Sequence, residues 1–216
     1  MDKIPDRKAE TRQRILNAAS ALFRRHGVDG VGVDAIMDRA GLTHGGFYGH
    51  FASKEALVAE VCAHELGQSA ARWAEMAGQP DGFARIVAQY LRPQHAEIGD
   101  SGCVLTTLGP EVARRREACS RVTEAMRNMA DTLALILPAR RSRPRALAAL
   151  STLVGAVVLA RASSDPALAA EILQAAQAAL SPPKAEGNRS RSRMPNSTES
   201  NQSSLPKNEL AGPEVR

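Results

Sequence analysis

Apolar residues recur with a helical period along most of the chain. The first such segment carries them at Ile15, Leu16, Ala19, Leu22 and Phe23. This spacing places all five on one face of a helix. We expect Gly27 to end that helix.

Three further helices are expected before residue 70. A short one covers Asp34–Ala40 and stops at Gly41, which can take the left-handed conformation that follows helix ends. Thr43 is a natural N-cap for a third helix that runs to His50, and Ser53 caps a fourth. The helical period continues past Leu57, so a long connecting helix is expected.

Beyond a break at Gly78–Gly82 the sequence predicts a helical body. The predicted helices are separated by Pro, Gly and Ser and lie near 83–97, 104–118, 120–137, 144–164 and 166–180. Residues 181–216 carry almost no large apolar side chains and are expected to be a disordered tail. Residues 1–7 are expected to form an N-terminal arm.

Composition supports a chain made of helices. Apolar residues make up 44%, but only 3% are aromatic, and the excess is Ala, Leu and Val. The net charge of +5 does not identify a nucleic-acid surface, because the first 68 residues hold equal numbers of basic and acidic side chains. The fold class predicted is all-α, and any binding surface must be found in local sequence.

The chain is predicted to be cytoplasmic, with no membrane contact. Its three cysteines, Cys62, Cys103 and Cys119, lack the spacing of a metal site or a redox pair. The longest apolar run, 147–160, has 14 residues and is judged too short to cross a bilayer. We therefore expect no metal and no cofactor.

The segment from 31 to 50 has the spacing of a helix-turn-helix, with helices at 34–40 and 45–50 around a four-residue turn. The residues themselves resemble the TetR family of bacterial transcription regulators. The shared residues are Arg14-Ile15-Leu16, Ala18-Ala19, Leu22-Phe23, Gly27, Val33, Ile36, Ala40-Gly41-Leu42, Gly46-Phe47-Tyr48, His50-Phe51, Ser53-Lys54-Glu55 and Leu57. This resemblance implies a DNA-binding domain at 8–68 and an effector-binding and dimerisation domain at 69–180.

Six residues are candidates for the DNA surface. In the family, the matching positions lie against DNA, and here they are Thr43, His44, Gly45, Tyr48, His50 and Lys54. Bare glycines let a backbone approach a groove wall, and a lysine at a helix N-terminus opposes the dipole unless a phosphate is near. For His50, capping of its neighbours is an equally good interpretation. Arg7, Lys8 and Arg12 are further candidates for backbone contact, or are simply solvated.

Phe47 and Phe51 are assigned to packing beneath this surface, while His26 and His64 are treated as solvated. The segment 45–50 contains no Arg or Lys, so the usual bidentate reader of guanine is absent from it. The operator sequence therefore cannot be derived.

The resemblance implies a homodimeric repressor, associated with the nucleoid, that leaves a palindromic operator when an effector binds. Two final apolar helices, 144–164 and 166–180, are typical of a dimer bundle, although packing within one chain would explain them equally. Trp73, Phe83, Tyr90, Leu105, Met126 and Met129 have the residue types of a pocket lining but are more simply core residues.

Cys103 follows Gly102 at a helix start, where a thiol is activated, and Arg114–Arg116 could lie nearby. Some TetR-type regulators sense electrophiles or oxidants through a cysteine in a similar Gly-Cys pair, so Cys103 is a candidate sensor. The alternative is a small buried residue. Cys62 and Cys119 are expected to be structural.

Two other classes of function were weighed against a regulator. An enzyme is disfavoured because no HExxH, GxSxG, Walker or GxGxxG pattern is present. A helical interaction module would explain the body but would leave the Gly45–Tyr48 segment and Lys54 without a role.

Overall fold

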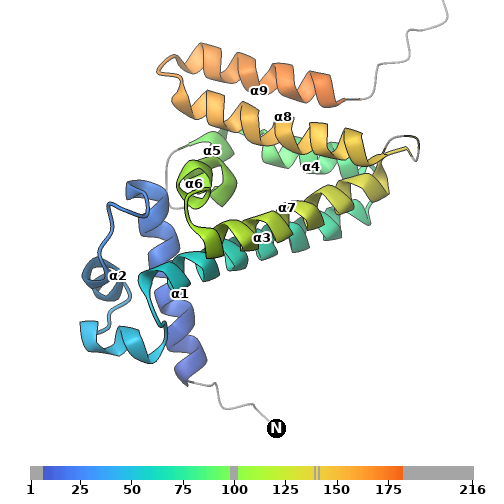
Figure 1. Cartoon of the computed structure of the whole chain (residues 1–216). Helices are drawn as coiled ribbons and strands as arrows, with labels where there is room; N and C mark the ends of the chain where they lie inside the picture. Colours follow the sequence, from blue (N-terminus) through green and yellow to red (C-terminus); the bar gives the residue numbers. More distant parts are fainter. Residues whose placement is uncertain (1–6, 98–101, 139, 141, 182–216) are drawn as a thin grey trace, which may run out of the picture. The chain divides into compact units, whose positions relative to one another are not determined.

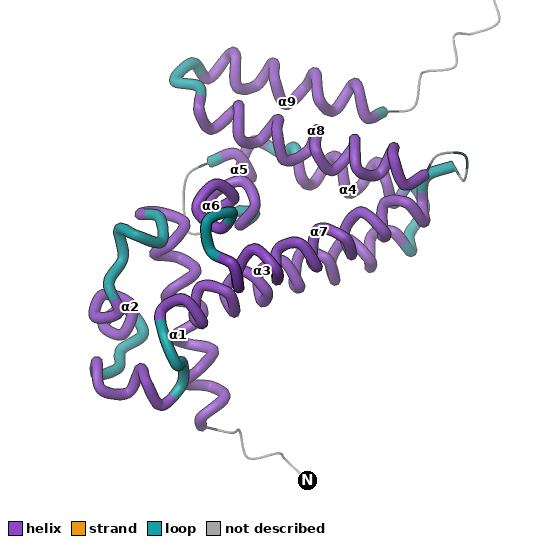
Figure 2. Tube along the Cα trace, in the orientation of Figure 1, coloured by secondary structure: helices purple, strands orange, loops and turns teal. Residues whose placement is uncertain are grey.

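The computed structural model describes residues 7–97, 102–138, 140 and 142–181. Every regular element in these ranges is a helix (Figures 1 and 2), which confirms the all-α class. The elements are α1 (Arg7–His26), α2 (Val33–Arg39), the 3₁₀ helix η1 (His44–Gly49), α3 (Lys54–Ala77), α4 (Gly82–Tyr90), α5 (Pro93–Ala96), α6 (Val104–Val112), α7 (Arg116–Ile136), α8 (Ser142–Ala162) and α9 (Pro166–Leu180). The predicted arm and tail lie, apart from Arg7 and Ser181, outside the described residues.

The first three α-helices begin and end close to where the sequence predicts. Gly27 and Gly41 follow α1 and α2 with φ of +73° and +67°, a conformation that costs other residues more than glycine. The Ser53 hydroxyl accepts a hydrogen bond from the amide of Ala56 at 3.0 Å and so caps α3. The predicted long connecting helix is confirmed as α3, which has 24 residues.

The prediction of one continuous helix at 83–97 is wrong, because the helix is interrupted between α4 and α5. Arg92 has an extended backbone, with φ −65° and ψ 145°, and Pro93 begins α5. A residue before proline is pushed out of the helical region by the proline ring. The break turns His95 back toward the end of α4, where its ring centroid lies 4.5 Å from that of Tyr90.

The boundary predicted near residue 119 is also wrong. Helix α6 ends at Val112, and Arg115 is extended before α7 begins at Arg116. Ala118, Val122 and Ala125 are buried along one face of α7, so the helical period that includes Ala118 belongs to the second helix.

Four helices, α3, α7, α8 and α9, make up most of the body. Helix α3 packs along α7, and α8 packs on both α7 and α9 (Figure 1). The apolar run at 147–160 lies within the longer helix α8, whose length and hydropathy would allow it to cross a membrane, so the judgement that it was too short is wrong. Its buried residues, among them Leu150, Leu153 and Val157, are part of the hydrophobic core.

Candidate nucleic-acid interface and body cavity

The second helix of the helix-turn-helix is a short 3₁₀ helix rather than an α-helix. In η1 the amide of Gly46 donates to the carbonyl of Thr43 at 3.1 Å, and the amide of His50 donates to the carbonyl of Phe47 at 2.9 Å. Glycine is about 1 kcal/mol less favourable than alanine in an α-helix, and three of the six residues are glycine. Thr43 occupies the N-cap position, but its side chain makes no capping hydrogen bond.

Two buried aromatic rings support this segment from below. Phe47 and Phe51 are 0% and 3% exposed, and their ring centroids are 5.7 Å apart, which confirms their assignment to packing. Because Phe47 is anchored in the core, its neighbours on η1 point outward. Thr43, His44, Gly45 and Tyr48 are all exposed, Tyr48 by 65%.

The outward face has room for a close partner. An added Cβ at Gly45 would meet no atom within 4 Å, so this backbone is open to solvent rather than packed against the protein. The ring of His44 is held by a hydrogen bond between its Nδ1 and the carboxylate of Asp34 on α2. That bond fixes one edge of the imidazole and leaves Nε2 as the edge available to a ligand.

Lys54 and His50 flank this face and are both half-buried. The Nδ1 of His50 is buried without a hydrogen-bond partner among the described residues, and the carbonyl of His50 accepts from Arg12. Lys54 is the first residue of α3, at the positive end of the helix dipole. The structure therefore brings all six sequence candidates to one end of the N-terminal helices.

Arg12 forms contacts within the protein, so it is not simply a solvated side chain, while its contact with DNA stays a prediction. Its guanidinium pairs with Glu60 on α3 and lies 4.2 Å from the centre of the Phe51 ring. These contacts tie α1 to α3 beneath the exposed segment. His64 is likewise not merely solvated, because its Nε2 lies 3.1 Å from Gln13 Nε2 and 2.8 Å from Gln68 Nε2.

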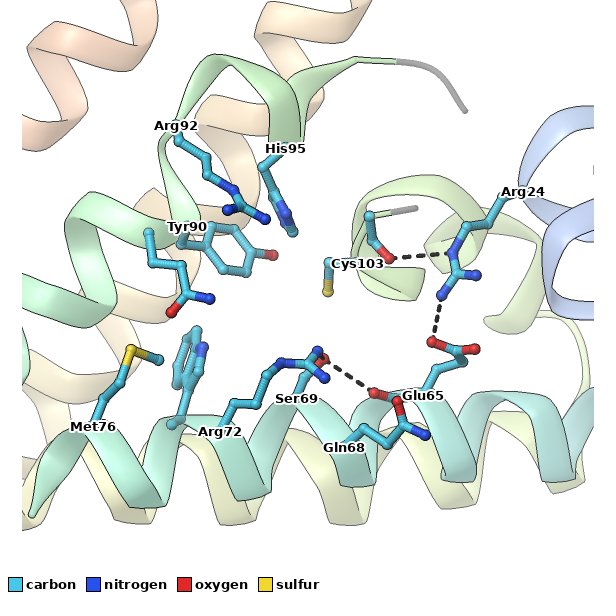
Figure 3. Close-up of a pocket in the computed structure, with 13 residues that line it drawn as sticks. Arg24, Glu65, Gln68, Ser69, Arg72, Met76, Tyr90, Arg92, His95 and Cys103 are labelled. Atoms are coloured by element: carbon cyan, nitrogen blue, oxygen red, sulfur yellow. Dashed lines mark hydrogen bonds and ion pairs between the residues drawn. The ribbon is translucent and has the colours of Figure 1, made fainter. Parts of the chain in front are cut away.

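A cavity of about 420 Å³ lies in the body, between α3, the end of α4, α5 and the start of α6 (Figure 3). Its wall also includes Arg24 from α1. The lining residues are Arg24, Glu65, Gln68, Ser69, Arg72, Trp73, Met76, Gln89, Tyr90, Arg92, His95, Gly102 and Cys103. Of the pocket candidates named from sequence, Trp73 and Tyr90 line this cavity.

Cys103 lies at the cavity wall and is only 4% exposed. Its thiol lies near Tyr90 and near the charge of Arg161, rather than near Arg114–Arg116 as expected, and makes no hydrogen bond to the Tyr90 hydroxyl. Arg115 pairs instead with Asp29 and Glu55 at the other end of α6. The cationic side chain near Cys103 is therefore Arg161 of α8.

Arg161 makes several hydrogen bonds at the start of α6. It donates to the hydroxyls of Thr106 and Thr107, both at 2.7 Å, and to the backbone carbonyl of His95 at 2.9 Å. Gly102 has φ +130°, and an added Cβ there would collide with the Arg161 guanidinium. Only glycine fits at this turn, which places Cys103 at the cavity wall.

Burial, together with the nearby charges of Arg161 and Arg92, lowers the pKa of His95 to about 4. In the unfolded chain the pKa is near 6.5. Between pH 6.5 and about 4, the folded protein therefore binds a proton at His95 less tightly than the unfolded chain does. The stability contributed by neutral His95 is complete above pH 6.5 and is lost as the pH falls through this window.

We expect His95→Gln to remove this part of the acid sensitivity. Because His95 is partly exposed, the effect should be about 1–2 kcal/mol, measured as the difference in urea unfolding free energy between pH 7 and pH 4.5. His26→Gln, at an exposed position on α1, is the matched control and should behave as wild type. An unchanged pH profile in His95→Gln would show that another group causes the acid sensitivity.

The other two cysteines lie in different surroundings. Burial raises the pKa of Cys62 to about 11, which keeps its thiol protonated and unreactive at neutral pH. Cys119 is half-buried and lines a second, largely apolar cavity of about 520 Å³ between α6, α7 and α8, together with Leu105 and Met126. Among the described residues, no group of three His, Cys, Asp or Glu side chains could hold a metal ion.

Helix α6 is bonded to the N-terminal helices at both of its ends. At its start, Arg24 of α1 donates to the carbonyl of Gly102 at 3.1 Å and pairs with Glu65 at 2.5 Å. At its end, Glu111 accepts from the amide of Val28 at 2.8 Å. These bonds connect α6 to α1 and to the turn that follows α1.

Sequence reasoning missed the cationic side of the cavity. Arg24, Arg72 and Arg161 lie on α1, α3 and α8, and Arg92 lies between α4 and α5, so the four are far apart in the sequence. Only the packing of α1, α3 and α8 around α6 brings them together, and no local pattern could have revealed it.

The N-terminal region matches known regulators. Residues 15–61 match the family model of bacterial regulatory proteins of the tetR family. The HTH-type transcriptional regulator UidR of Escherichia coli K12 is 35% identical over 75 residues, covering 35% of this chain and 38% of UidR. The HTH-type transcriptional repressor KstR2 of Mycobacterium tuberculosis H37Rv is 34% identical over 76 residues, again covering 35% of this chain and 38% of the relative. Each match thus spans less than two fifths of these relatives.

Similarity in fold extends beyond this region. The reduced form of E. coli NemR aligns with a TM-score of 0.68 at 23% identity, covering 79% of this chain and 95% of NemR. A TetR transcriptional regulator from Chloroflexus aurantiacus aligns with a TM-score of 0.69 at 25% identity, covering 82% and 94% of the two chains. The chain therefore carries an N-terminal region of the tetR family type, and its described helices are similar in fold to solved TetR-family regulators.

Proposed function

We propose that this protein is a cytoplasmic, nucleoid-associated transcriptional repressor that binds palindromic operator DNA as a homodimer. The observation that carries the proposal is the exposed face of η1, which is held outward by buried Phe47 and Phe51. A helix-turn-helix reads DNA with such a segment in the major groove. We propose that the whole chain uses it to regulate transcription, as the names of its relatives indicate for them.

The six residues at this face have different proposed roles. Thr43, His44 and Gly45 are at the N-terminal end of η1, where free N–H groups favour an acceptor on phosphate or on a base edge. The Tyr48 hydroxyl, the His50 ring and the Lys54 ammonium are proposed to contact phosphates on either side. Since no Arg or Lys lies on η1, groove shape contributes to the choice of sequence.

Lys54→Gln should weaken operator binding at all sequences alike. Removing one phosphate contact is expected to lower the slope of log affinity against log salt by about 1. Binding titrations between 50 and 200 mM salt measure this slope. Arg85→Gln, which removes a positive charge on α4, is the matched control. If Lys54→Gln and wild type have the same slope of log affinity against log salt, Lys54 is not a phosphate contact.

Helices α8 and α9 are proposed to form the dimer interface. Leu147, Val158 and Leu159 on α8 and Leu168 on α9 are 41–59% exposed. Large apolar side chains on neighbouring helices favour burial against a second copy. A two-fold dimer of this kind would present two recognition segments to the two half-sites of a palindrome.

We propose that release is triggered from the body cavity, either by a small molecule bound there or by modification of Cys103. Both triggers act on the start of α6, where Arg24 and Arg161 meet Gly102 and Cys103. DNA half-sites are about 34 Å apart, so a small displacement of α1 is enough to lose register between the two recognition segments.

An electrophile would add to Cys103 through its thiolate. With an α,β-unsaturated carbonyl compound, a carbon–sulfur bond forms at the β-carbon and the α-carbon takes up a proton. The adduct cannot fit without moving the Tyr90 hydroxyl or the start of α6, because Cys103 is 4% exposed. The solved structure of E. coli NemR is of a reduced form, which makes a thiol switch a reasonable comparison.

N-ethylmaleimide should release wild-type protein from DNA but leave Cys103→Ser bound. A mobility shift follows release, and mass spectrometry of the protein counts the adducts. Cys119→Ser is the matched control and should respond as wild type. If Cys103→Ser and wild type are released alike, Cys103 is structural and the trigger is a reversible ligand.

A further inference from the structure

The body cavity has an excess of positive charge. Arg72 and Arg92 line it, and neither forms an ion pair within the described part of the chain. Arg72 donates a hydrogen bond to the hydroxyl of Ser69 at 3.0 Å. The single carboxylate among the lining residues, Glu65, is paired with Arg24. Both arginines are exposed at the rim of the cavity, and their positive charges would attract an anion to it.

A third arginine adds to this charge from behind the wall. Arg161 donates only to neutral oxygens, those of Thr106, Thr107, Ala96 and His95. Burial lowers the pKa of Arg161, which is the direction expected when a cation has no anionic partner to offset desolvation.

Two buried polar atoms in the same wall have no hydrogen-bond partner among the described residues. These are the hydroxyl of Tyr90 and the Nε2 of His95. Tyr90 is 5% exposed, and a buried donor left unpaired costs about 1–3 kcal/mol. In Figure 3 the Tyr90 side chain extends into the cavity between Arg92 and Arg72. An oxyanion at this place would accept from a hydroxyl and two guanidinium groups.

Part of the cavity wall is apolar and aromatic. Trp73 and Tyr90 lie edge to face with their centroids 5.7 Å apart, and Met76 also lines the cavity. These side chains favour a planar apolar group. The cavity, at about 420 Å³, is within the range of sites that hold small organic molecules.

We propose that the cavity binds a small organic carboxylate, with its anionic group between Arg72 and Arg92 and its planar apolar part against Trp73. The Tyr90 hydroxyl donates to one carboxylate oxygen, and each guanidinium donates to the group from its own side. Carboxylate binding in the cavity stands apart from the proposed function, and only the role of the carboxylate as the effector rests on it. This inference assigns a chemical class to the ligand that occupies the cavity.

The test uses the full chain without DNA. Trp73 is the only tryptophan in the sequence, so tryptophan fluorescence reports directly on the cavity. The probes are benzoate and 2-naphthoate, compared with benzamide and 2-naphthamide, which have the same shape and no charge. Fluorescence titration and thermal unfolding are measured at constant ionic strength. We expect at least one carboxylate to bind at least tenfold more tightly than its amide.

Arg72→Gln/Arg92→Gln should weaken carboxylate binding at least tenfold while leaving amide binding unchanged. Tyr90→Phe should weaken it less, because one donor of three is lost. The matched control, Arg121→Gln, changes an exposed arginine of α7 that does not line the cavity and should bind as wild type.

The proposal is overturned if neither carboxylate changes the fluorescence or the melting temperature, if the amides bind as tightly, or if the double arginine variant binds carboxylates as wild type does. The repressor proposal is tested separately by the mobility shift. If carboxylates bind through Arg72 and Arg92 and operator DNA is not bound, the anion site stands and the repressor proposal fails.

Discussion

Phe47→Ala is expected to lower the free energy of unfolding by about 3–5 kcal/mol and to abolish operator binding. Phe47 is fully buried, stacks on Phe51, and meets Tyr48 with ring centroids 5.3 Å apart. It is the only buried residue of η1, so its loss leaves a cavity beneath a glycine-rich segment with little helical propensity of its own. Urea unfolding and a mobility shift measure the two effects.

The matched control is Tyr48→Phe at the next position. Tyr48 is exposed, so its stability should change by less than about 0.5 kcal/mol, and its affinity for DNA should fall only by the loss of one phosphate contact. A Phe47→Ala protein with stability within about 1 kcal/mol of wild type would show that η1 is not held by the packing described here.

Arg24→Met is expected to lower the free energy of unfolding by about 3–5 kcal/mol, because it removes one partner of a buried ion pair. Arg24 is 8% exposed and is bonded to Glu65 and to the carbonyl of Gly102. Its loss leaves the Glu65 carboxylate uncompensated and breaks the bond from α1 to the start of α6. Any variant that still binds operator should therefore no longer respond to a ligand in the cavity.

A double-mutant cycle separates these two consequences. In Arg24→Met/Glu65→Gln no charge is left unpaired, so much of the lost stability should return. The response of DNA binding to a cavity ligand should not return, since the bond to Gly102 is still absent. Equal stability for the single and double variants would contradict a charge-pair origin, and a restored response would contradict a role for Arg24 in coupling.

Local sequence was sufficient to predict the N-terminal helices. Gly27, Gly41 and Ser53 act within a few residues of the helix ends that they determine, and their conformations in the structure are those expected. The 3₁₀ geometry of η1 is consistent with its glycines. Pro93 was visible in the sequence and could have predicted the break between α4 and α5.

The cavity, by contrast, could not be predicted from sequence. Arg24, Arg72, Arg92 and Arg161 come together only through tertiary packing, and His95 reaches Tyr90 because of the break at Pro93. Cys103 was singled out by its position after Gly102, but its true neighbours, Tyr90 and Arg161, are distant in sequence. The pairing of Arg12 could not be predicted for the same reason, since its partner Glu60 is on another helix.

The most direct test of the central claim is a salt-titrated mobility shift of the full chain on the DNA that flanks its own gene. The account predicts specific binding of two chains to a palindromic site, at least about a thousandfold tighter than to random DNA, and weakening steeply as salt rises. Binding with equal affinity to random DNA, or no binding at 50 mM salt, would contradict the proposal that this protein is an operator-specific repressor.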